Sequence, residues 1–253
     1  MIDLTNMLLL CLAGFLAGAM NALAGGGSFV SLPALIAAGV PSVAANASST
    51  VALWPGGAAS VFVYRDGLGQ VAGVPLRPTL LATLTGGFFG ALLLLWTPTS
   101  LFDRVLPWLL LVATLVLTFG PKLGPLLRRH FSAGIVTVLS IQFILGIYGG
   151  YFGGAVGLMM LAVWSLLDAA DIKTLNPSRA LMTTAANTVA MLTFIVAGVV
   201  HWPATVALAL GALAGGYGGA HLGRKLPPRM VRAGTILFAC VVTVIFFLRA
   251  YRG

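Results

Sequence analysis

The chain opens with a stretch of 61 residues, Leu4–Tyr64, that contains no charged side chain. At roughly 20 residues per crossing, such a stretch holds two or three bilayer-spanning segments. The composition of the whole chain agrees, with 59% hydrophobic and 8% charged residues and a mean hydropathy of +1.04. These values exclude a soluble domain. We therefore expect an all-α polytopic membrane protein, because helices satisfy their own backbone hydrogen bonds in lipid.

Further charge-free runs divide the rest of the chain. Two long runs cover 38 residues at 130–167 and 44 residues at 180–223. Counting all the apolar segments predicts about eight full transmembrane helices plus two short broken or half helices. The short segments lie at 28–39 and 155–167, and both are too short to span a bilayer comfortably.

A glycine-rich interruption precedes each short segment. Asn21–Ser28 carries three adjacent glycines, Gly25–Gly27, and Gly149–Gly157 repeats the feature in the second half of the chain. Adjacent glycines destabilise a helix, and the backbone groups that they free need a partner within protein or water. Two interruptions at matching places predict a cavity that binds a ligand, as in transporters with broken helices.

The two halves resemble each other in the order of their motifs. Gly14–Gly18 corresponds to Gly146–Gly150, and Gly86–Gly90 corresponds to Gly215–Gly219. This common order predicts a duplication within one integral membrane domain. We expect the first transmembrane repeat at 1–125 and the second at 126–253.

The basic residues predict how the repeats are oriented. If each short segment carries the chain across the membrane, eleven of the 14 Lys and Arg residues fall on one side; if both are re-entrant, seven fall on each. The positive-inside rule favours the first arrangement. With five segments each, the repeats are then inverted, and both termini lie on the periplasmic or extracellular side of the inner membrane.

The interruptions are the first candidate binding site. A broken helix followed by a short one presents unpaired N–H groups and a positive dipole end, which suit an anion. The alternative is that the glycines only allow helices to pack closely. From these motifs we predict a substrate site at Asn21, Gly25, Gly26, Gly27 and Ser28, completed from the second half by Gly153, Gly154 and Gly157.

Polar patches within apolar runs are the second candidate. Four hydrogen-bonding side chains, Asn46, Ser48, Ser49 and Thr50, lie within five residues, and their counterpart is Thr183, Thr184, Asn187 and Thr188. Of these we select Asn46, Ser48, Ser49, Thr183, Thr184 and Asn187 as substrate-binding residues. Such neutral donors suit an oxyanion, although hydroxyls also bond to their own helix carbonyls. We also expect Trp54–Gly57 to line this cavity. Arg179 either attracts an anion into the vestibule or is a snorkelling anchor.

Acidic residues are scarce: the chain has no Glu, and its five Asp residues lie at segment ends. This pattern gives no support for a carboxylate proton relay or sodium site. No metal-ligand spacing, phosphate-binding loop or catalytic set is present, so we expect no enzyme, metal or cofactor. The net charge of +9 follows from topology signals at helix ends and does not predict nucleic-acid binding.

Three motifs together resemble the sulfite exporter TauE/SafE family. They are Asn-Ala-Leu-Ala-Gly-Gly-Gly-Ser-Phe at 21–29, Asn46–Gly57 and Leu175-Asn-Pro-Ser-Arg-Ala-Leu at 175–181. The resemblance covers nearly the whole chain and implies a small permease for sulfite, sulfonates or sulfoacetate. The family often has Asn-Ala-Thr-Ser at Asn46–Ser49 and commonly Lys at Arg179, which leaves the substrate open.

We therefore expect a secondary transporter for small sulfur-containing or organic anions. Alternating access would occur at a midplane site between the two repeats. The alternatives are an anion channel and a non-catalytic membrane subunit of a larger complex. The expected partners are the anion and the lipid bilayer, and a homodimer is left open.

Overall fold

The computed structural model describes residues 3–24, 26–127, 134–167, 172–223 and 228–251. Within these ranges the chain forms ten α-helices, one 3-10 turn and no strand, apart from an isolated bridge between Val71 and Val74. The helices are α1 (Leu4–Ala24), α2 (Ser28–Ala37), α3 (Ser42–Tyr64), α4 (Leu76–Trp96), α5 (Thr99–Leu127), α6 (Ile135–Tyr151), α7 (Val156–Leu167), α8 (Ile172–Val196), α9 (Trp202–Gly223) and α10 (Pro228–Tyr251), with the turn η1 at Arg65–Gly67.

The expectation of an all-α membrane protein is confirmed. In the described part of the chain, five helices (α1, α4, α5, α8 and α10) are long and apolar enough to cross a bilayer. The two short helices, α2 and α7, occupy the segments predicted at 28–39 and 155–167. The number of full crossings stays a prediction.

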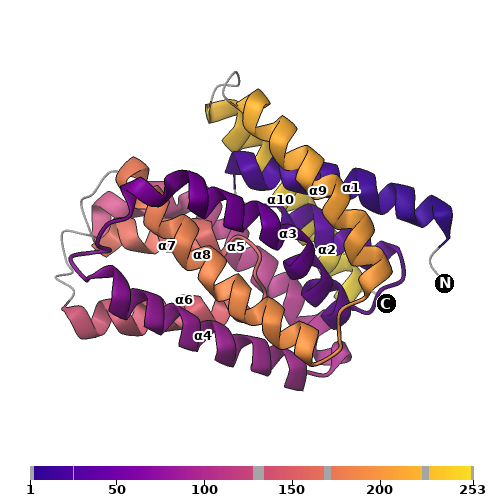
Figure 1. Ribbon diagram of the computed structural model, residues 1–253, viewed down its shortest axis with the longest axis horizontal. Helices are drawn as coiled ribbons and strands as arrows, with labels where there is room; N and C mark the ends of the chain where they lie inside the picture. Colours follow the sequence, from indigo (N-terminus) through magenta and orange to yellow (C-terminus); the bar gives the residue numbers. More distant parts are fainter. Residues whose placement is uncertain (1–2, 25, 128–133, 168–171, 224–227, 252–253) are drawn as a thin grey trace.

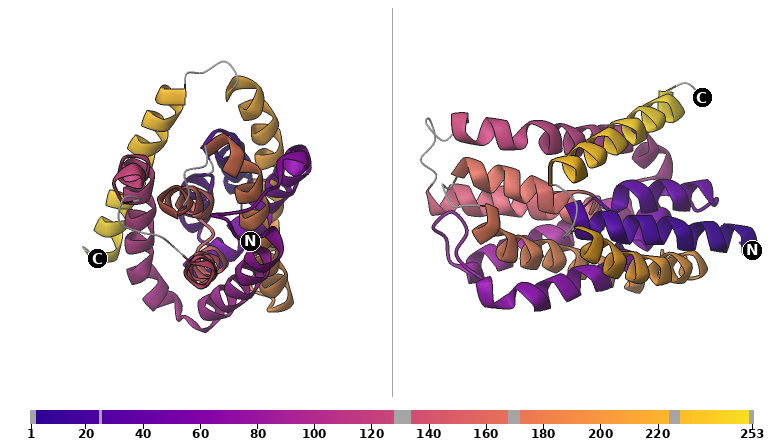
Figure 2. Two further views of the ribbon diagram at one scale, coloured as in Figure 1. Left: turned by 90° about the vertical axis from the view of Figure 1, so that its left-hand side faces the viewer. Right: turned by 90° about the horizontal axis from the view of Figure 1, so that it is seen from above.

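Helices α1 and α9 lie side by side, although one opens the chain and the other is near its end (Figures 1 and 2). Small residues bring their backbones together: a Cβ on Gly215 would overlap the carbonyl of Phe15, and one on Gly18 would overlap that of Ala212. Cys11 faces Gly211 as Phe15 faces Gly215, so the two helices run in the same direction. These glycines therefore serve close helix packing.

Helices α4 and α6 form a second pair of the same kind (Figure 1). A Cβ on Gly90 would overlap the carbonyl of Ile147, and one on Gly150 would overlap that of Gly87. Gly86 faces Phe143 as Gly90 faces Ile147, so these two helices also run in the same direction. The first helix of each half thus packs against the fourth helix of the other half.

Helices α3 and α8 cross in the middle of the molecule in opposite directions. The indole Nε1 of Trp54 donates to Thr188 Oγ1 at 2.8 Å, and further along α3 Gly57 lies against Thr184, earlier on α8. Helices α5 and α10 are also antiparallel, because Thr114 Oγ1 lies 3.1 Å from Thr243 Oγ1 and Trp108 Nε1 donates to the hydroxyl of Tyr251 at 3.0 Å.

The two short helices fill the interior. In α2 the side chains of Phe29, Leu32 and Leu35 are buried, and α2 packs on α1 and α3. In α7 the side chains of Met160 and Trp164 are buried, and α7 packs on α5 and α8. The start of each short helix therefore lies inside the bundle, next to α3 or α8.

The α1–α9 contact yields a stability prediction. Gly215→Ala should lower the free energy of unfolding by about 1–3 kcal/mol, because its Cβ would overlap the carbonyl of Phe15. Gly218→Ala, on the same helix, is the matched control, since its Cβ would lie 3.8 Å from the nearest atom of Phe15. Thermal unfolding in detergent measures both, and equal melting temperatures would contradict the packing.

Candidate functional site

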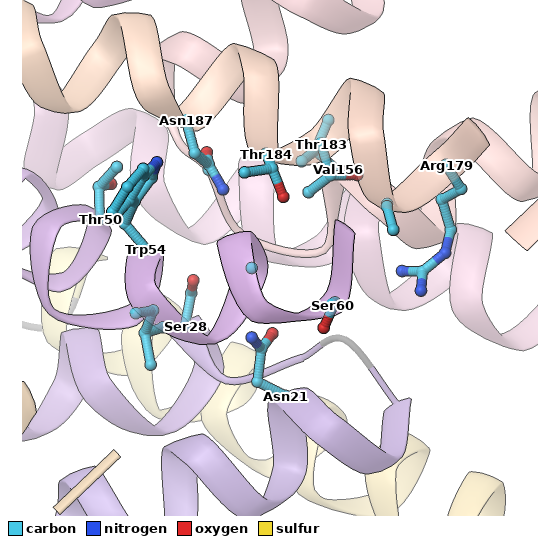
Figure 3. Close-up of a pocket in the computed structure, with 15 residues that line it drawn as sticks. Asn21, Ser28, Thr50, Trp54, Ser60, Val156, Arg179, Thr183, Thr184 and Asn187 are labelled. Carbon is cyan, nitrogen blue, oxygen red and sulfur yellow. The ribbon is translucent and has the colours of Figure 1, made fainter. Parts of the chain in front are cut away.

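A cavity lies between α3 and α8, with α1, α2 and the start of α7 around it (Figure 3). It holds about 730 Å³ of space unfilled by atoms, including its mouth. Its walls combine polar side chains, a few apolar ones and one cation. They are formed by Asn21, Ser28, Thr50, Leu53, Trp54, Gly57, Ser60, Gly153, Val156, Gly157, Arg179, Ala180, Thr183, Thr184 and Asn187.

One wall is a single face of α3. Thr50, Trp54, Gly57 and Ser60 follow one another at three or four residues, which places them on one side of a helix. Gly57 allows the close approach of α8, because a Cβ there would lie 3.0 Å from Thr184 Oγ1. This face covers about 15 Å from Thr50 to Ser60, at a rise of 1.5 Å per residue.

The opposite wall is a single face of α8. Arg179, Thr183, Thr184 and Asn187 also recur at helical spacing, and Figure 3 shows them facing α3 across the cavity. The hydroxyl of Thr188 fixes this wall to α3, since it accepts from Trp54 and donates to the carbonyl of Thr184 at 2.7 Å.

The break between α6 and α7 supplies the third wall. Gly153 has a φ of +69°, which glycine adopts without strain, and Ala155 has a φ of +57°, which is uncommon for a residue with a side chain. The chain can therefore turn sharply between Tyr151 and Val156. The N–H groups of Leu158 and Met159 donate to the carbonyl of Ala155, both at 3.0 Å, whereas those of Val156 and Gly157, which line the cavity, have no acceptor within their helix.

Of the described residues that line the cavity, Arg179 is the only charged one. Its Nε donates to Asn176 Oδ1 at 2.8 Å. Its terminal nitrogen lies beside the start of α7, because a Cβ on Gly157 would lie 2.8 Å from it. The ion pair between described residues is Arg65–Asp66, so Arg179 has no carboxylate partner in the part of the chain that the structure describes.

Asn187 also has unused hydrogen-bonding capacity. Its Oδ1 is buried and has no hydrogen-bond partner among the described residues. The atom lies near Gly153, where a Cβ would be 3.5 Å away. A buried unpaired acceptor is costly, so this amide is suited to a partner that enters the cavity.

Eight of the residues predicted from the sequence meet in this cavity. They are Asn21, Ser28, Gly153, Gly157, Arg179, Thr183, Thr184 and Asn187. Of the stretch Trp54–Gly57, which was expected to line the cavity, Trp54 and Gly57 do so and Pro55 and Gly56 do not. That these residues bind a substrate stays a prediction.

The patch at Asn46–Ser49 does not line the cavity. Asn46 donates to the carbonyl of Tyr151 at 2.9 Å, at the end of α6. Ser48 Oγ accepts from the backbone N–H of His201 at 2.9 Å, and Ser49 Oγ lies 2.6 Å from Ser31 Oγ. In this conformation these side chains are bonded to protein groups of other segments, so they are not free to bind a ligand.

The glycines at the first break are also placed differently from the expectation. Gly26 lies among Met20, Phe29 and Thr235, outside the cavity. Gly27 packs on α1, since a Cβ there would lie 2.6 Å from the carbonyl oxygen of Ala17. For these two residues the structure favours close packing over an amide cup. Gly25 lies outside the described residues.

Gly154 is likewise outside the cavity. A Cβ at this position would lie 2.5 Å from the ring of Phe152, so the glycine makes room for that buried aromatic side chain. In the second break only Gly153 and Gly157, of the three predicted glycines, reach the cavity.

Several lining residues were missed by the sequence prediction. Thr50, Leu53 and Ser60 lie on the α3 face, and Val156 and Ala180 lie on α7 and α8. A signal for three of them exists, because residues 50, 53, 54, 57 and 60 have the spacing of one helical face.

Nothing among the described residues holds three His, Cys, Asp or Glu side chains together in a metal-binding group. The two cysteines, Cys11 and Cys240, are unpaired and far apart in the sequence. The chemistry available in the cavity is therefore hydrogen bonding by amides, hydroxyls and backbone N–H groups, together with the positive charge of Arg179.

Comparisons with known proteins converge on one family. The family model described as "Sulfite exporter TauE/SafE" matches residues 10–246. A "Probable membrane transporter protein" of Haemophilus influenzae is 29% identical, with 98% of this chain and 95% of that protein covered. A "Probable membrane transporter protein YfcA" of Escherichia coli is 27% identical, with 90% and 84% covered. No solved structure matches.

The cavity yields an accessibility prediction. In a background with Cys11→Ser and Cys240→Ser, Thr184→Cys should react with a small charged thiol reagent, because position 184 lines the cavity. Thr83→Cys is the matched control, since Thr83 on α4 is fully buried away from the cavity. Labelling rates followed by mass spectrometry compare the two. Equal protection of both thiols would mean that the cavity is closed to water.

Proposed function

Because the chain belongs to the sulfite exporter TauE/SafE family, we propose that this multi-pass membrane transporter carries small sulfur-containing or organic anions through the cavity between α3 and α8. Sulfite, sulfonates and sulfoacetate are the candidate substrates. The transporter is of the secondary type and lies in the inner membrane with both termini outside.

The main support for this proposal is the position of Arg179 in the cavity wall. A guanidinium that is partly buried, and that has no described carboxylate partner, is unfavourable by itself because desolvation of the charge is uncompensated. An anion in the cavity would supply the missing opposite charge. A guanidinium also matches the planar spacing of two oxygen atoms on a carboxylate or sulfonate.

The remaining groups suit an oxyanion whose charge is spread over several oxygens. The hydroxyls of Thr183 and Thr184 and the first amides of α7 offer donors around the guanidinium. Asn187 offers both a donor and an acceptor, so it could also bond to a hydroxyl on the anion. Trp54 and Leu53 provide apolar wall further along, where the organic part of a sulfonate would lie.

We infer that the two halves, 1–125 and 126–253, are inverted repeats. Helices that would be equivalent in the two halves meet as α3 with α8 and as α5 with α10, and both pairs are antiparallel. Repeats of the same orientation would place equivalent helices parallel. An odd number of crossings in each half accounts for the inversion.

Alternating access is supported by the closed end of the cavity. Thr50 is the lining residue closest to the start of α3. In the turn that precedes it, the side chains of Asn46, Ser48 and Ser49 are at most 2% exposed. Their bonds to Tyr151, His201 and Ser31 join four segments across the bundle. Opening on that side would require the bonds between the halves, Asn46–Tyr151 and Ser48–His201, to separate.

This bonded layer favours a transporter over an anion channel, which needs a continuous pore. Uptake into vesicles that saturates at low turnover agrees with a transporter, whereas a single-channel conductance would establish the alternative. Isolation of the protein with an obligate catalytic partner would instead support the role of a subunit in a larger complex.

The transport proposal predicts the effect of removing the cavity's cation. Purified protein in proteoliposomes should take up radiolabelled sulfite, with competition by ethanesulfonate and sulfoacetate. Arg179→Gln should lower kcat/KM by about 10- to 100-fold, the size expected for losing one hydrogen bond to a charged group. Arg77→Gln is the control, since Arg77 is exposed at the start of α4 and does not line the cavity. Normal uptake by Arg179→Gln would refute this site.

The closed end of the cavity predicts a reversible block. The pair Ser48→Cys with His201→Cys joins the two halves where Ser48 Oγ and His201 N are 2.9 Å apart. In protein without native cysteines, mild oxidation of this pair should stop uptake, and reduction should restore it. Each single variant should be insensitive to the oxidant. Undiminished uptake by the cross-linked protein would show that this end does not open during transport.

A further inference from the structure

Among the described residues, the guanidinium of Arg179 makes one hydrogen bond, to Asn176. Asn176 lies one turn before Arg179 on α8, and its Oδ1 accepts from Nε at 2.8 Å. An arginine side chain has many rotamers, so a guanidinium at the edge of a cavity is oriented only where a group holds it. Because this bond uses Nε, neither terminal nitrogen is taken up by a partner in the described part of the chain.

The free end of the guanidinium points at the start of α7. A Cβ on Gly157 would lie 2.8 Å from a terminal nitrogen of Arg179 and 3.0 Å from Thr183 Oγ1. The guanidinium and the first amides of α7 therefore meet at one place. The hydroxyl of Thr183 lies beside them and donates to Met160 Sδ at 3.7 Å. Figure 3 shows Arg179 reaching from α8 into this space.

The turn that carries Asn176 is itself held in place from outside the cavity. Ser178 Oγ donates to the carbonyl of Gly69 at 2.8 Å and accepts from the N–H of Gly69 at 3.2 Å. Pro177 packs against Gly67, where a Cβ would be 2.9 Å away. Asn176 thus stands on a turn fixed to the segment after α3, which makes it a rigid support.

We propose that Asn176 is a positioning residue that aims the guanidinium of Arg179 at the oxygens of the transported anion. This inference rests on the proposed function. A neutral amide is the suitable partner, because it orients the guanidinium without cancelling its charge. A carboxylate at the same position would hold Arg179 equally well but would compete with the anion for it.

The different effects of an amide and a carboxylate at position 176 can be tested by substitution. Asn176→Ala should raise the KM for sulfite by about tenfold, because the guanidinium loses its orientation while its charge remains. Asn176→Asp should raise the KM by about 100-fold, since a hydrogen-bonded ion pair would neutralise Arg179. The maximal rate should change much less than the KM in both variants. Uptake of radiolabelled sulfite into proteoliposomes measures both quantities.

A merely structural role predicts the opposite order. Asp would preserve the packing and strengthen the contact with Arg179, so Asn176→Asp would then behave better than Asn176→Ala. Melting temperatures of the purified variants separate loss of folding from loss of affinity. Thr174→Ala, at an exposed position on the same helix, should leave the KM unchanged.

These measurements separate a failure of the proposed transport function from a failure of the role of Asn176. A wild-type protein that takes up none of sulfite, ethanesulfonate or sulfoacetate would overturn the proposed function and, with it, the role of Asn176. Normal uptake by the wild type with an unchanged KM in both Asn176 variants, or with the Asp variant the better of the two, would overturn the role of Asn176 alone.

Discussion

Every interruption of a helix inside a bilayer must find partners for the backbone groups that it releases. The break between α6 and α7 shows how this chain meets that requirement. The carbonyl of Tyr151 accepts from Asn46 of α3, and the N–H of Phe152 donates to Tyr148 within α6. The bond from Asn46 connects the break to α3, and the chain then turns through Gly153 into the cavity.

The close helix crossings make this arrangement possible. Where α1 meets α9 and α4 meets α6, the backbones touch at glycines, and any side chain would overlap a carbonyl. Helices that cannot gain from the hydrophobic effect in lipid associate through such close contact. The two pairs leave α3 and α8 to face each other at the centre, with the short helices on either side.

The electrostatics of the cavity depend on how few charged groups line it. A single guanidinium stands among uncharged donors, and the groups that hold it in the described structure are neutral. In a low-dielectric interior an opposite charge that enters such a site is attracted more strongly than in water. The site is therefore suited to an anion, and the neutral donors distribute its charge.

The sequence shows where helices break more reliably than it shows which side chains face the cavity. The short helices α2 and α7 fall where glycine spacing and segment length placed them, because both signals are local. On α8, Arg179, Thr183, Thr184 and Asn187 were predicted, since each is polar within an apolar run. On α3 the same reasoning selected Asn46, Ser48 and Ser49, whose partners lie elsewhere. It left Thr50, a member of the same polar patch, out of the site and did not consider Ser60, although both line the cavity.

By itself the sequence determined that this chain is a helical membrane protein and that two of its helices are short. These properties depend on composition and on residues within a turn or two of one another. Only the tertiary structure decided which polar residues face the cavity. Asn46 and Tyr151 are separated by 105 positions, and Ser48 and His201 by 153, so their bonding depends on how distant helices pack.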